Sequence, residues 1–397
     1  MNASNIVNQF LSSVTNNMHK TRRNAVSSCV QSLLSGAASS VTAIGRGINS
    51  TAKEKHNIKR ADRLCSNVIL QSELLNIYGG IVRRFVTSNR PLIHVDWSDL
   101  DVSKRNFLIR ASVALDGRSI TIYQEVHSIR TKEKPTSHLA FLTKLKVLLS
   151  AECKPIIVTD AGFKTPWFRQ VLSLGWDYVG RTRKPNFYVI NGCKDWQCIT
   201  QLYKSASQTP KTFNGSITRY SPLECRLVLY KNTNKGRHHI NRQGIPHSSS
   251  QSKQHAKGGK DPWLLSTSLK QTQSLGRRAV AIYRTRMQIE EGFRDMKSST
   301  FGLGYNASQS YKLARLAVLL FLNVVASLVL IVLGMAIVLA KQHFQYQANT
   351  VKNRRVLSYH FIGLRVIADR RLKILSDQLK QAMAKIHSLI EVANYDF

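Results

Sequence analysis

The feature that most limits how this chain can fold is an uncharged apolar segment between residues 316 and 340. It reads LAVLLFLNVVASLVLIVLGMAIVLA, and Asn323, Ser327 and Gly334 interrupt it. Its length and hydropathy meet the usual test for a membrane-spanning helix. A central helix that is buried on every side is also apolar all round. Because the sequence has no second such segment and is basic on both sides of this one, we favour the buried helix over a membrane span.

The charge balance points to a polyanionic partner. The 397 residues include 58 Lys and Arg against 22 Asp and Glu, a net charge of +36. With 43% apolar and 20% charged residues the chain can bury a sizeable core, which excludes a disordered tail, a collagen-like chain and a disulfide-stapled domain. Such a cationic surface repels itself unless phosphates or acidic headgroups neutralise it, so nucleic acid is the first expected partner and a membrane surface the second.

The six cysteines form no CxxC pair, and the N-terminus lacks the charged and then apolar run of a secretory signal. A reducing compartment, and therefore a cytoplasmic location, fits best. A zinc site built from Cys193, Cys198, His238 and His239 would match no standard ligand spacing, so we do not favour it.

The central part of the chain follows an alternating pattern of strands and helices. Two strands at 106–115 and 118–126 flank the tight turn Asp116-Gly117. A helix at 138–149 places Leu139, Leu142, Leu145 and Leu149 on one face. The full expected series is a strand at 92–97, the two strands of the hairpin, the helix at 138–149, a strand at 155–160, a helix at 164–174 and a strand at 176–180. This β-β-β-α-β-α-β order is the one that a ribonuclease-H-like α/β fold, a mixed sheet flanked by helices, requires.

Composition divides the chain into five expected regions. Residues 1–85 form an all-α N-terminal domain, in which Ser50 and Thr51 cap a helix rich in cations, and 86–184 form the first part of the catalytic core. Residues 185–260 form a β-rich insertion whose basic loop, 231–260, could grip phosphates or could be a solvated linker. Residues 261–310 complete the core with a strand at 263–267 and a helix from 274 to 297. Residues 311–397 form a helical, basic C-terminal region that we expect to serve dimerisation and to contact DNA.

Two aspartates on apolar strands are the first candidates for chemistry. Asp96 and Asp160 each end a run of apolar residues, where an isolated carboxylate is costly to desolvate. A carboxylate there can project from the sheet edge and hold a divalent cation. The alternative is that each aspartate caps the turn that follows it.

The helix expected at 274–297 supplies a third carboxylate. At about 100° per residue, one face carries Tyr283, Arg286, Glu290 and Lys297. Glu291 lies about 100° away and Asp295 nearly opposite, so Glu290 is the acid that faces the strand ends. The adjoining face is apolar and can dock on the sheet; it consists of Ile282, Ile289, Phe293 and Met296. The alternative is an ordinary amphipathic helix with an i,i+4 salt bridge between Arg286 and Glu290.

Four segments in this order resemble a known family. YRTRMQIEEGFRDMKS resembles the Y-(2)-R-(3)-E-(6)-K signature of bacterial DDE transposases of the insertion-sequence-4 family. VDWSDL around Asp96, TDAGFKTPWF around Asp160 and KHNIKRADRL near the N-terminus are similar to the same family, and above all to the subgroup typified by the transposon ten enzyme. The resemblance spans about residues 44 to 357.

The resemblance implies a role for each matching residue. It implies that Asp96, Asp160 and Glu290 form the metal-binding catalytic triad, which would hold two Mg²⁺ or Mn²⁺ ions. Tyr283, Arg286 and Lys297 would bind DNA phosphates. Trp263 would stack a flipped base during hairpin formation, or else would be a core tryptophan. The N-terminal residues implied to read the end of the element are Lys53, Lys55, His56, Lys59, Arg60 and Arg63.

The implied activity is cut-and-paste transposition of an insertion sequence by a soluble protein that does not enter the membrane. The protein would bind terminal inverted repeats, cleave DNA through a hairpin and transfer the 3′ ends to target DNA as a homodimer, with the C-terminal helices pairing the subunits. A ribonuclease-H-like nuclease that cannot integrate and a silent DNA-binding relative are the alternatives.

Overall fold

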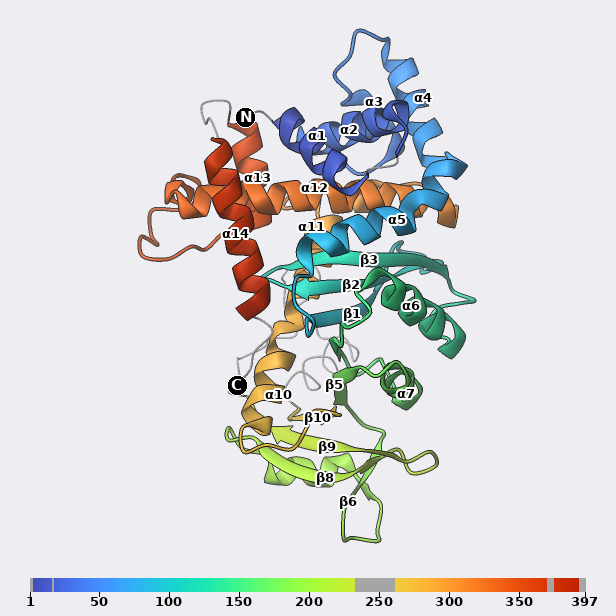
Figure 1. Ribbon diagram of the computed structural model, residues 1–397, viewed down its shortest axis with the longest axis vertical. Coiled ribbons are helices and arrows are strands. Elements are labelled where there is room, and N and C mark those ends of the chain that lie inside the picture. Colours follow the sequence, from blue (N-terminus) through green and yellow to red (C-terminus); the bar gives the residue numbers. More distant parts are fainter. Residues whose placement is uncertain (1–2, 16–17, 233–260, 370–374, 393–397) are drawn as a thin grey trace, which may run out of the picture. The chain divides into compact units, whose positions relative to one another are not determined.

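The structure, a computed structural model, describes residues 3–15, 18–232, 261–369 and 375–392. The chain divides into two compact units, coloured along the sequence in Figure 1. Unit 1 is formed by two separate stretches, up to Pro155 and from Arg286 onward, and unit 2 by the intervening stretch Ile156–Thr285. The predicted boundaries at 85, 184, 260 and 310 divide the chain differently and stay predictions.

Unit 1 combines many helices with three antiparallel strands in the order β3-β2-β1. The strands are β1 (Leu92–Asp99), β2 (Asn106–Ala114) and β3 (Ser119–Ser128). The helices of the first stretch are α1 (Ala3–Val14), α2 (Lys20–Leu34), α3 (Val41–Arg46), α4 (Glu54–Cys65), α5 (Val68–Phe85) and α6 (Pro135–Leu148). Those of the second stretch are α11 (Met287–Lys297), α12 (Leu313–Leu339), α13 (Tyr359–Ala368) and α14 (Ser376–Val392), with 3-10 turns η2 (Tyr305–Ala307) and η3 (Gln342–Tyr346).

Unit 2 is built on a mixed sheet in the order β4-β5-β10-β9-β8-β6-β7. Strands β4 and β5 pair in parallel, and the described neighbours of β10, β9, β8 and β6 pair antiparallel. The strands are β4 (Ile156–Thr159), β5 (Asp177–Thr182), β6 (Phe187–Ile190), β7 (Gln197–Cys198), β8 (Lys211–Ile217), β9 (Leu223–Tyr230) and β10 (Trp263–Thr267). The helices are α7 (Thr165–Ser173), α8 (Ile199–Leu202) and α10 (Leu275–Thr285), with the 3-10 turn η1 (Tyr203–Ser205).

The predicted strand and helix order is confirmed from β1 to β5, and the described part of the β-rich insertion predicted at 185–260 contains β6, β7, β8 and β9. Gly117, at φ +71°, closes the predicted hairpin turn between β2 and β3. The predicted buried face of α6 is wrong at Leu139, which is 45% exposed. The helix begins at Pro135, and Leu142 and Leu145 of the predicted face are buried together with Phe141 and Leu148. The predicted basic loop at 231–260 lies outside the described residues except for its first two.

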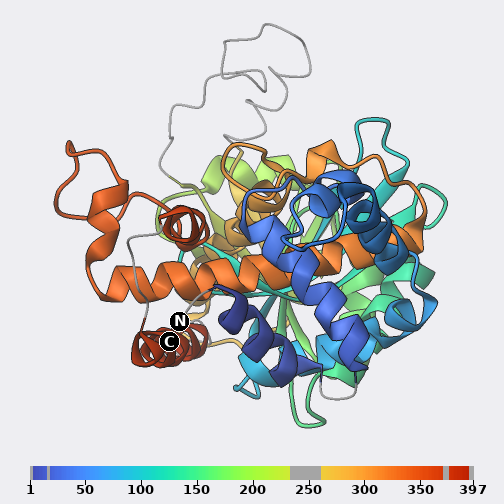
Figure 2. The same ribbon diagram turned by 90° about the horizontal axis from the view of Figure 1, so that it is seen from above.

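The apolar segment of the sequence is helix α12, and it is the core of unit 1. It is long and apolar enough to cross a membrane, but 89% of its most apolar window is buried inside the protein. Helices α1, α2, α4, α5, α13 and α14 and strand β3 all contact it. Figure 1 shows α5 and α12 running beside β3, and Figure 2 shows α13 and α14 near one end of α12. The buried-helix interpretation therefore agrees with the structure.

The three residues that interrupt this apolar segment each meet a specific partner. Asn323 Nδ2 donates to Ser39 Oγ (2.6 Å) and to its own helix at Leu319 O (2.7 Å). Ser327 Oγ lies 3.4 Å from His360 Nε2 on α13. Gly334 lets the backbone of Tyr359 approach so closely that any Cβ would overlap its carbonyl oxygen. These interruptions fix how α12 is seated among its neighbours.

We expect Gly334→Ala to destabilise the protein by about 2 kcal/mol, because the new methyl group forces α12 and α13 apart. Urea unfolding followed by circular dichroism measures this. The matched control is Gly79→Ala in α5, where a Cβ would meet nothing closer than Arg83 Nη1 at 3.5 Å. That change should be neutral or stabilising by up to about 1 kcal/mol. Equal midpoints for the two variants would contradict the close packing of α12 against α13.

Candidate active site

Asp96 lies inside β1 rather than at its end, because the strand continues to Asp99. This corrects the predicted strand of 92–97. The side chain is 9% exposed, and its Oδ1 accepts from the backbone N of Trp97 (2.8 Å). Its Oδ2 accepts from Arg286 Nη1 at 3.3 Å. A buried carboxylate on the sheet is therefore compensated by a cation that comes from the start of α11.

The same guanidinium binds the second predicted carboxylate. Arg286 Nη2 donates to Glu290 Oε1 at 2.5 Å, one turn along α11. Arg286 is 9% exposed, whereas the side chain of Glu290 is 41% exposed. Asp96 and Glu290, which are far apart in the sequence, are thus held on the two η nitrogens of one arginine. The i,i+4 salt bridge between Arg286 and Glu290 exists, but Asp96 makes it part of a three-residue group.

The other two acids of α11 face a different cation. Arg118 Nε donates to Asp295 Oδ2 (2.6 Å), and its Nη1 lies 3.6 Å from Glu291 Oε2. Glu291 also accepts from Arg294 Nη1 at 3.0 Å. Within the described ion pairs, Glu290 is the acid of α11 that shares an arginine with Asp96, as its position on the helix face predicted.

The predicted continuous helix from 274 to 297 is wrong, because it is interrupted at Arg286 between α10 and α11. Beside this interruption, Thr285 Oγ1 donates to Ile282 O at 2.7 Å, a type of side-chain bond to the preceding turn that often bends helices. Arg286 keeps helical backbone angles, φ −55° and ψ −33°. Tyr283 therefore belongs to α10 in unit 2, and Arg286, Glu290 and Lys297 belong to unit 1.

Lys297, at the end of α11, also contacts β1. Its Nζ donates to Ser98 Oγ at 2.8 Å. Ser98 follows Asp96 by two residues and so lies on the same face of the strand. Ser98 was not singled out in the sequence, although the alternation of Asp96 and Ser98 along a strand is the signal that could have found it. The predicted apolar residues of α11, Ile289, Phe293 and Met296, are buried and dock this helix on the strands.

Two further buried side chains that contain nitrogen, His94 and Arg110, lie close to Asp96 on the sheet. His94, two residues before Asp96, is fully buried, and burial together with the charge of Arg286 lowers its pKa to about 3. Arg110 stands directly across from Asp96 in the register of β2. Its Nε donates to Gln124 Oε1 (3.0 Å), and its guanidinium lies over the ring of Phe293 (4.7 Å). A neutral histidine and a fixed cation therefore flank the aspartate.

Trp97, the residue after Asp96, is held by a histidine pair that the sequence analysis missed. Its Nε1 donates to His138 Nε2 at 3.1 Å, and its ring meets His127 edge to face at 5.1 Å. His127 in turn lies 3.1 Å from Glu125, which also accepts from Lys144 Nζ (2.9 Å). Hydrogen bonds from these neighbours outweigh burial and lower the pKa of Glu125 to about 2. The network fixes β1 immediately beside its aspartate.

Unit 2 holds the remaining predicted core residues. Asp160 follows β4 directly, and its Oδ1 accepts from the backbone N of Gly162 at 2.8 Å, so it does cap the following turn. Trp263 begins β10 and stands between two tyrosines, at 4.9 Å from the ring of Tyr283 and 5.7 Å from that of Tyr230. Tyr283 is 5% exposed, and Trp263 is half-buried. An aromatic cluster therefore surrounds Trp263 in this unit.

Helix α4 presents the predicted N-terminal cations to solvent. Lys53 is its N-cap residue, and Lys55, His56, Lys59 and Arg63 are exposed. Arg60 is half-buried, with its Nη2 at 3.5 Å from Asn24 O. The opposite side of the helix is buried through Asn57, Ala61, Leu64 and Cys65. The predicted Ser50–Thr51 cap is wrong, because α4 starts at Glu54 and Ser50 Oγ donates instead to Asn57 Oδ1 (2.9 Å).

Two carboxylates of unit 1 suit a hard divalent cation. Among the described residues no three His, Cys, Asp or Glu side chains are grouped to hold a metal ion. Asp96 and Glu290 offer two carboxylates that already share one cationic group, Arg286, which is the donor chemistry that Mg²⁺ and Mn²⁺ prefer. For the alternative zinc site, Cys193 is exposed and Cys198 half-buried, while His238 and His239 lie outside the described residues.

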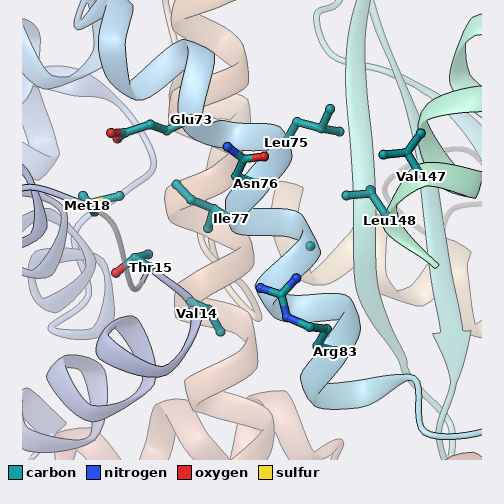
Figure 3. A pocket seen from close by; sticks show the side chains of 11 residues that line it. Val14, Thr15, Met18, Glu73, Leu75, Asn76, Ile77, Arg83, Val147 and Leu148 are labelled. Atoms are coloured by element: carbon teal, nitrogen blue, oxygen red, sulfur yellow. The ribbon is translucent and has the colours of Figure 1, made fainter. Parts of the chain in front are cut away.

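A surface hollow of about 440 Å³ lies elsewhere in unit 1, between α5, α6 and the connection from α1 to α2 (Figure 3). Its lining mixes apolar side chains with Glu73 and Arg83. Glu73 is already bound by Arg22 at 2.5 Å. None of the predicted site residues lines this hollow, so its size does not make it the candidate site.

An α/β protein with mixed strands and many helices, in which a strand and a helix bring two carboxylates to one arginine, is compatible with a ribonuclease-H-like DDE transposase. Residues 88–329 match the model of the transposase DDE domain family, and the chain belongs to this family. A comparison with curated proteins finds no match. Family membership supports a transposase, an enzyme that acts on DNA and belongs to a class that generally uses divalent metal ions.

Protonation of His138 should weaken the fold on mild acidification. Burial lowers the pKa of His138 from 6.5 to about 4, so the unfolded chain takes up this proton at a higher pH than the folded chain. The contribution of the neutral His138 ring to the free energy of unfolding is complete above about pH 6.5 and is lost as the pH falls toward 4. We expect the free energy of unfolding to fall by about 2 kcal/mol between pH 7 and pH 5. Urea unfolding at these two pH values should show a smaller difference in His138→Gln, whose side-chain oxygen can still accept from Trp97. A variant that keeps the full difference would show that another group is responsible.

Proposed function

We propose that this protein is a cut-and-paste DNA transposase of the insertion-sequence-4 type, closest to the transposon ten subgroup. In this proposal it binds the terminal inverted repeats of its element, cleaves the DNA strands through a hairpin and joins the 3′ ends to target DNA. It acts as a homodimer on paired ends in the cytoplasm, with the C-terminal helices pairing the subunits. The family match over residues 88–329 supports the enzyme class.

The catalytic triad of the proposal is Asp96, Asp160 and Glu290, which would hold two Mg²⁺ or Mn²⁺ ions. When bound, these ions would supply activation of the attacking oxygen and stabilisation of the leaving oxygen of the phosphodiester. The observation that carries the proposal is the shared contact of Asp96 and Glu290 with Arg286. Two carboxylates from separate regions of the chain are brought together, while the neighbouring acids of α11 bind Arg118 instead.

The cations and aromatic residues of the proposal bind the DNA. Arg286 and Lys297 lie next to Asp96 and Ser98 and would bind phosphates around the scissile bond, together with Tyr283. Trp263, half-buried in its aromatic cluster, would stack an unpaired base. The exposed cations of α4 would contact the terminal repeat, with the buried side of the helix anchoring it to unit 1.

Replacing Glu290 should abolish cleavage without abolishing DNA binding. In Glu290→Gln the carboxylate that would hold the metal ion becomes a neutral amide of nearly the same shape, and we expect cleavage of a labelled duplex carrying the element's end to fall at least about 10³-fold with Mg²⁺. The matched control is Glu291→Gln on the next position of the same helix, which contacts Arg118 and Arg294 and should cut nearly normally.

The same assay separates the alternatives. Intact protein that binds the ends and never cuts with Mg²⁺ or Mn²⁺ would replace the enzyme proposal by a DNA-binding one. Protein that cuts but never transfers the 3′ ends to a target duplex would be a nuclease without integration activity.

The α4 cations can be tested through the salt dependence of end binding. Lys59→Gln removes one exposed cation, so we expect weaker binding to the end duplex and a slope of log K against log salt that is smaller by about 1. Lys146→Gln removes an exposed cation of α6, which has no proposed role in DNA binding, and should leave the slope unchanged. Fluorescence anisotropy at several salt concentrations measures both, and identical slopes for the two variants would exclude a phosphate contact at Lys59.

A further inference from the structure

We propose that Arg286 is a positioning residue that takes the place of a divalent cation between Asp96 and Glu290, and that it must leave this place when a metal ion binds. This inference rests on the proposed function of the same carboxylates. It concerns an arginine whose expected role, binding DNA phosphate, gives no reason for it to bind both acids. The contacts at 3.3 Å and 2.5 Å join it to both.

Burial explains why a cation is needed there at all times. Asp96 and Arg286 are each 9% exposed, and an ionised carboxylate that is buried without compensation is costly. Two carboxylates brought together also repel each other, so without a cation they would separate or take up a proton. A guanidinium group is a permanent cation with several N–H donors, so Arg286 can offer one η nitrogen to each acid.

The position of Arg286 suits a residue that changes its contacts. It lies at the interruption between α10 and α11, next to the hydrogen bond from Thr285 Oγ1 to Ile282 O. Its guanidinium is divided between two carboxylates, with Nη1 donating to Asp96 and Nη2 to Glu290. Once replaced by a metal ion, Arg286 becomes available for phosphate, so the order of events would be metal first and phosphate contact second.

The direct test is metal binding in the absence of DNA. Mn²⁺ is titrated into the full-length protein, and free Mn²⁺ is measured by electron paramagnetic resonance. We expect Arg286→Gln to bind Mn²⁺ about tenfold more tightly than the wild type, because no cation competes for the carboxylate oxygens. Glu290→Gln in the Arg286→Gln background should remove the gain, which assigns it to this site.

The matched control is Arg294→Gln, which removes the same charge from an exposed position of the same helix. It should bind Mn²⁺ as the wild type does. An equal gain in Arg294→Gln would mean that overall charge is responsible and would overturn the proposal. So would Arg286→Gln protein that binds Mn²⁺ no more tightly than the wild type, since Arg286 would then not compete with the metal ion.

Arg286→Lys keeps the proposal testable if the glutamine variant does not fold. The ammonium group of a lysine contacts one carboxylate more readily than both at once, so it should compete less well with a metal ion than Arg286 does. This variant should therefore bind Mn²⁺ more tightly than the wild type. Wild-type or weaker affinity would overturn the proposal. Failure of the proposed function looks different: wild-type protein would not cleave end DNA with any metal ion, whatever the Mn²⁺ affinities of the Arg286 variants.

Discussion

The burial of α12 is the constraint on which unit 1 depends. A helix of 27 residues that is apolar on every side has to be covered all round, and one layer of helices cannot do this. Helices from both ends of the chain and strand β3 share the task, so residues far apart in sequence are bound into one unit. The edge-to-face contacts of Tyr78 with Phe321 and with Tyr123 join α5, α12 and β3 directly. Through β3 the same core supports the strand that carries Asp96.

Local sequence signals predicted much of the fold. The alternation of strands, the Asp116-Gly117 turn and the apolar face of α11 depend on neighbouring residues, and the structure has them. The failures come from interactions that periodicity does not encode. The helix expected at 274–297 is interrupted at Arg286, beside the bond from Thr285 Oγ1 to Ile282 O, and Ser50 binds Asn57 instead of capping α4. Leu139 is exposed because the buried stripe of α6 is centred on Phe141, Leu142, Leu145 and Leu148 and leaves Leu139 at its edge.

The sequence predicted which acidic residue of α11 belongs to the candidate site, but not which contacts the cations of the site make. Helical geometry placed Glu290 on a different face from Glu291 and Asp295. The ion pairs follow the same division, because Arg286 binds Glu290 whereas Arg118 lies beside Glu291 and binds Asp295. The joint contact of Arg286 with Asp96 could not be read from the helix alone, because it needs a partner 190 positions away. Trp97 with its histidines and Ser98 with Lys297 are likewise contacts across the fold. The placement of Asp160 and of the aromatic cluster is a property of unit 2 by itself.

The division of unit 1 into two stretches has a consequence for the newly made chain. Residues up to Pro155 leave the ribosome well before α12, whose surface they cover in the finished protein. At roughly 5 to 20 residues per second, the wait lasts on the order of ten seconds or more. The described residues of unit 2 all come from the stretch Ile156–Thr285, so this unit can fold during that interval, although it is made later. The first helices of the chain therefore keep apolar surface exposed during synthesis, when a chaperone or an unrelated chain could bind it.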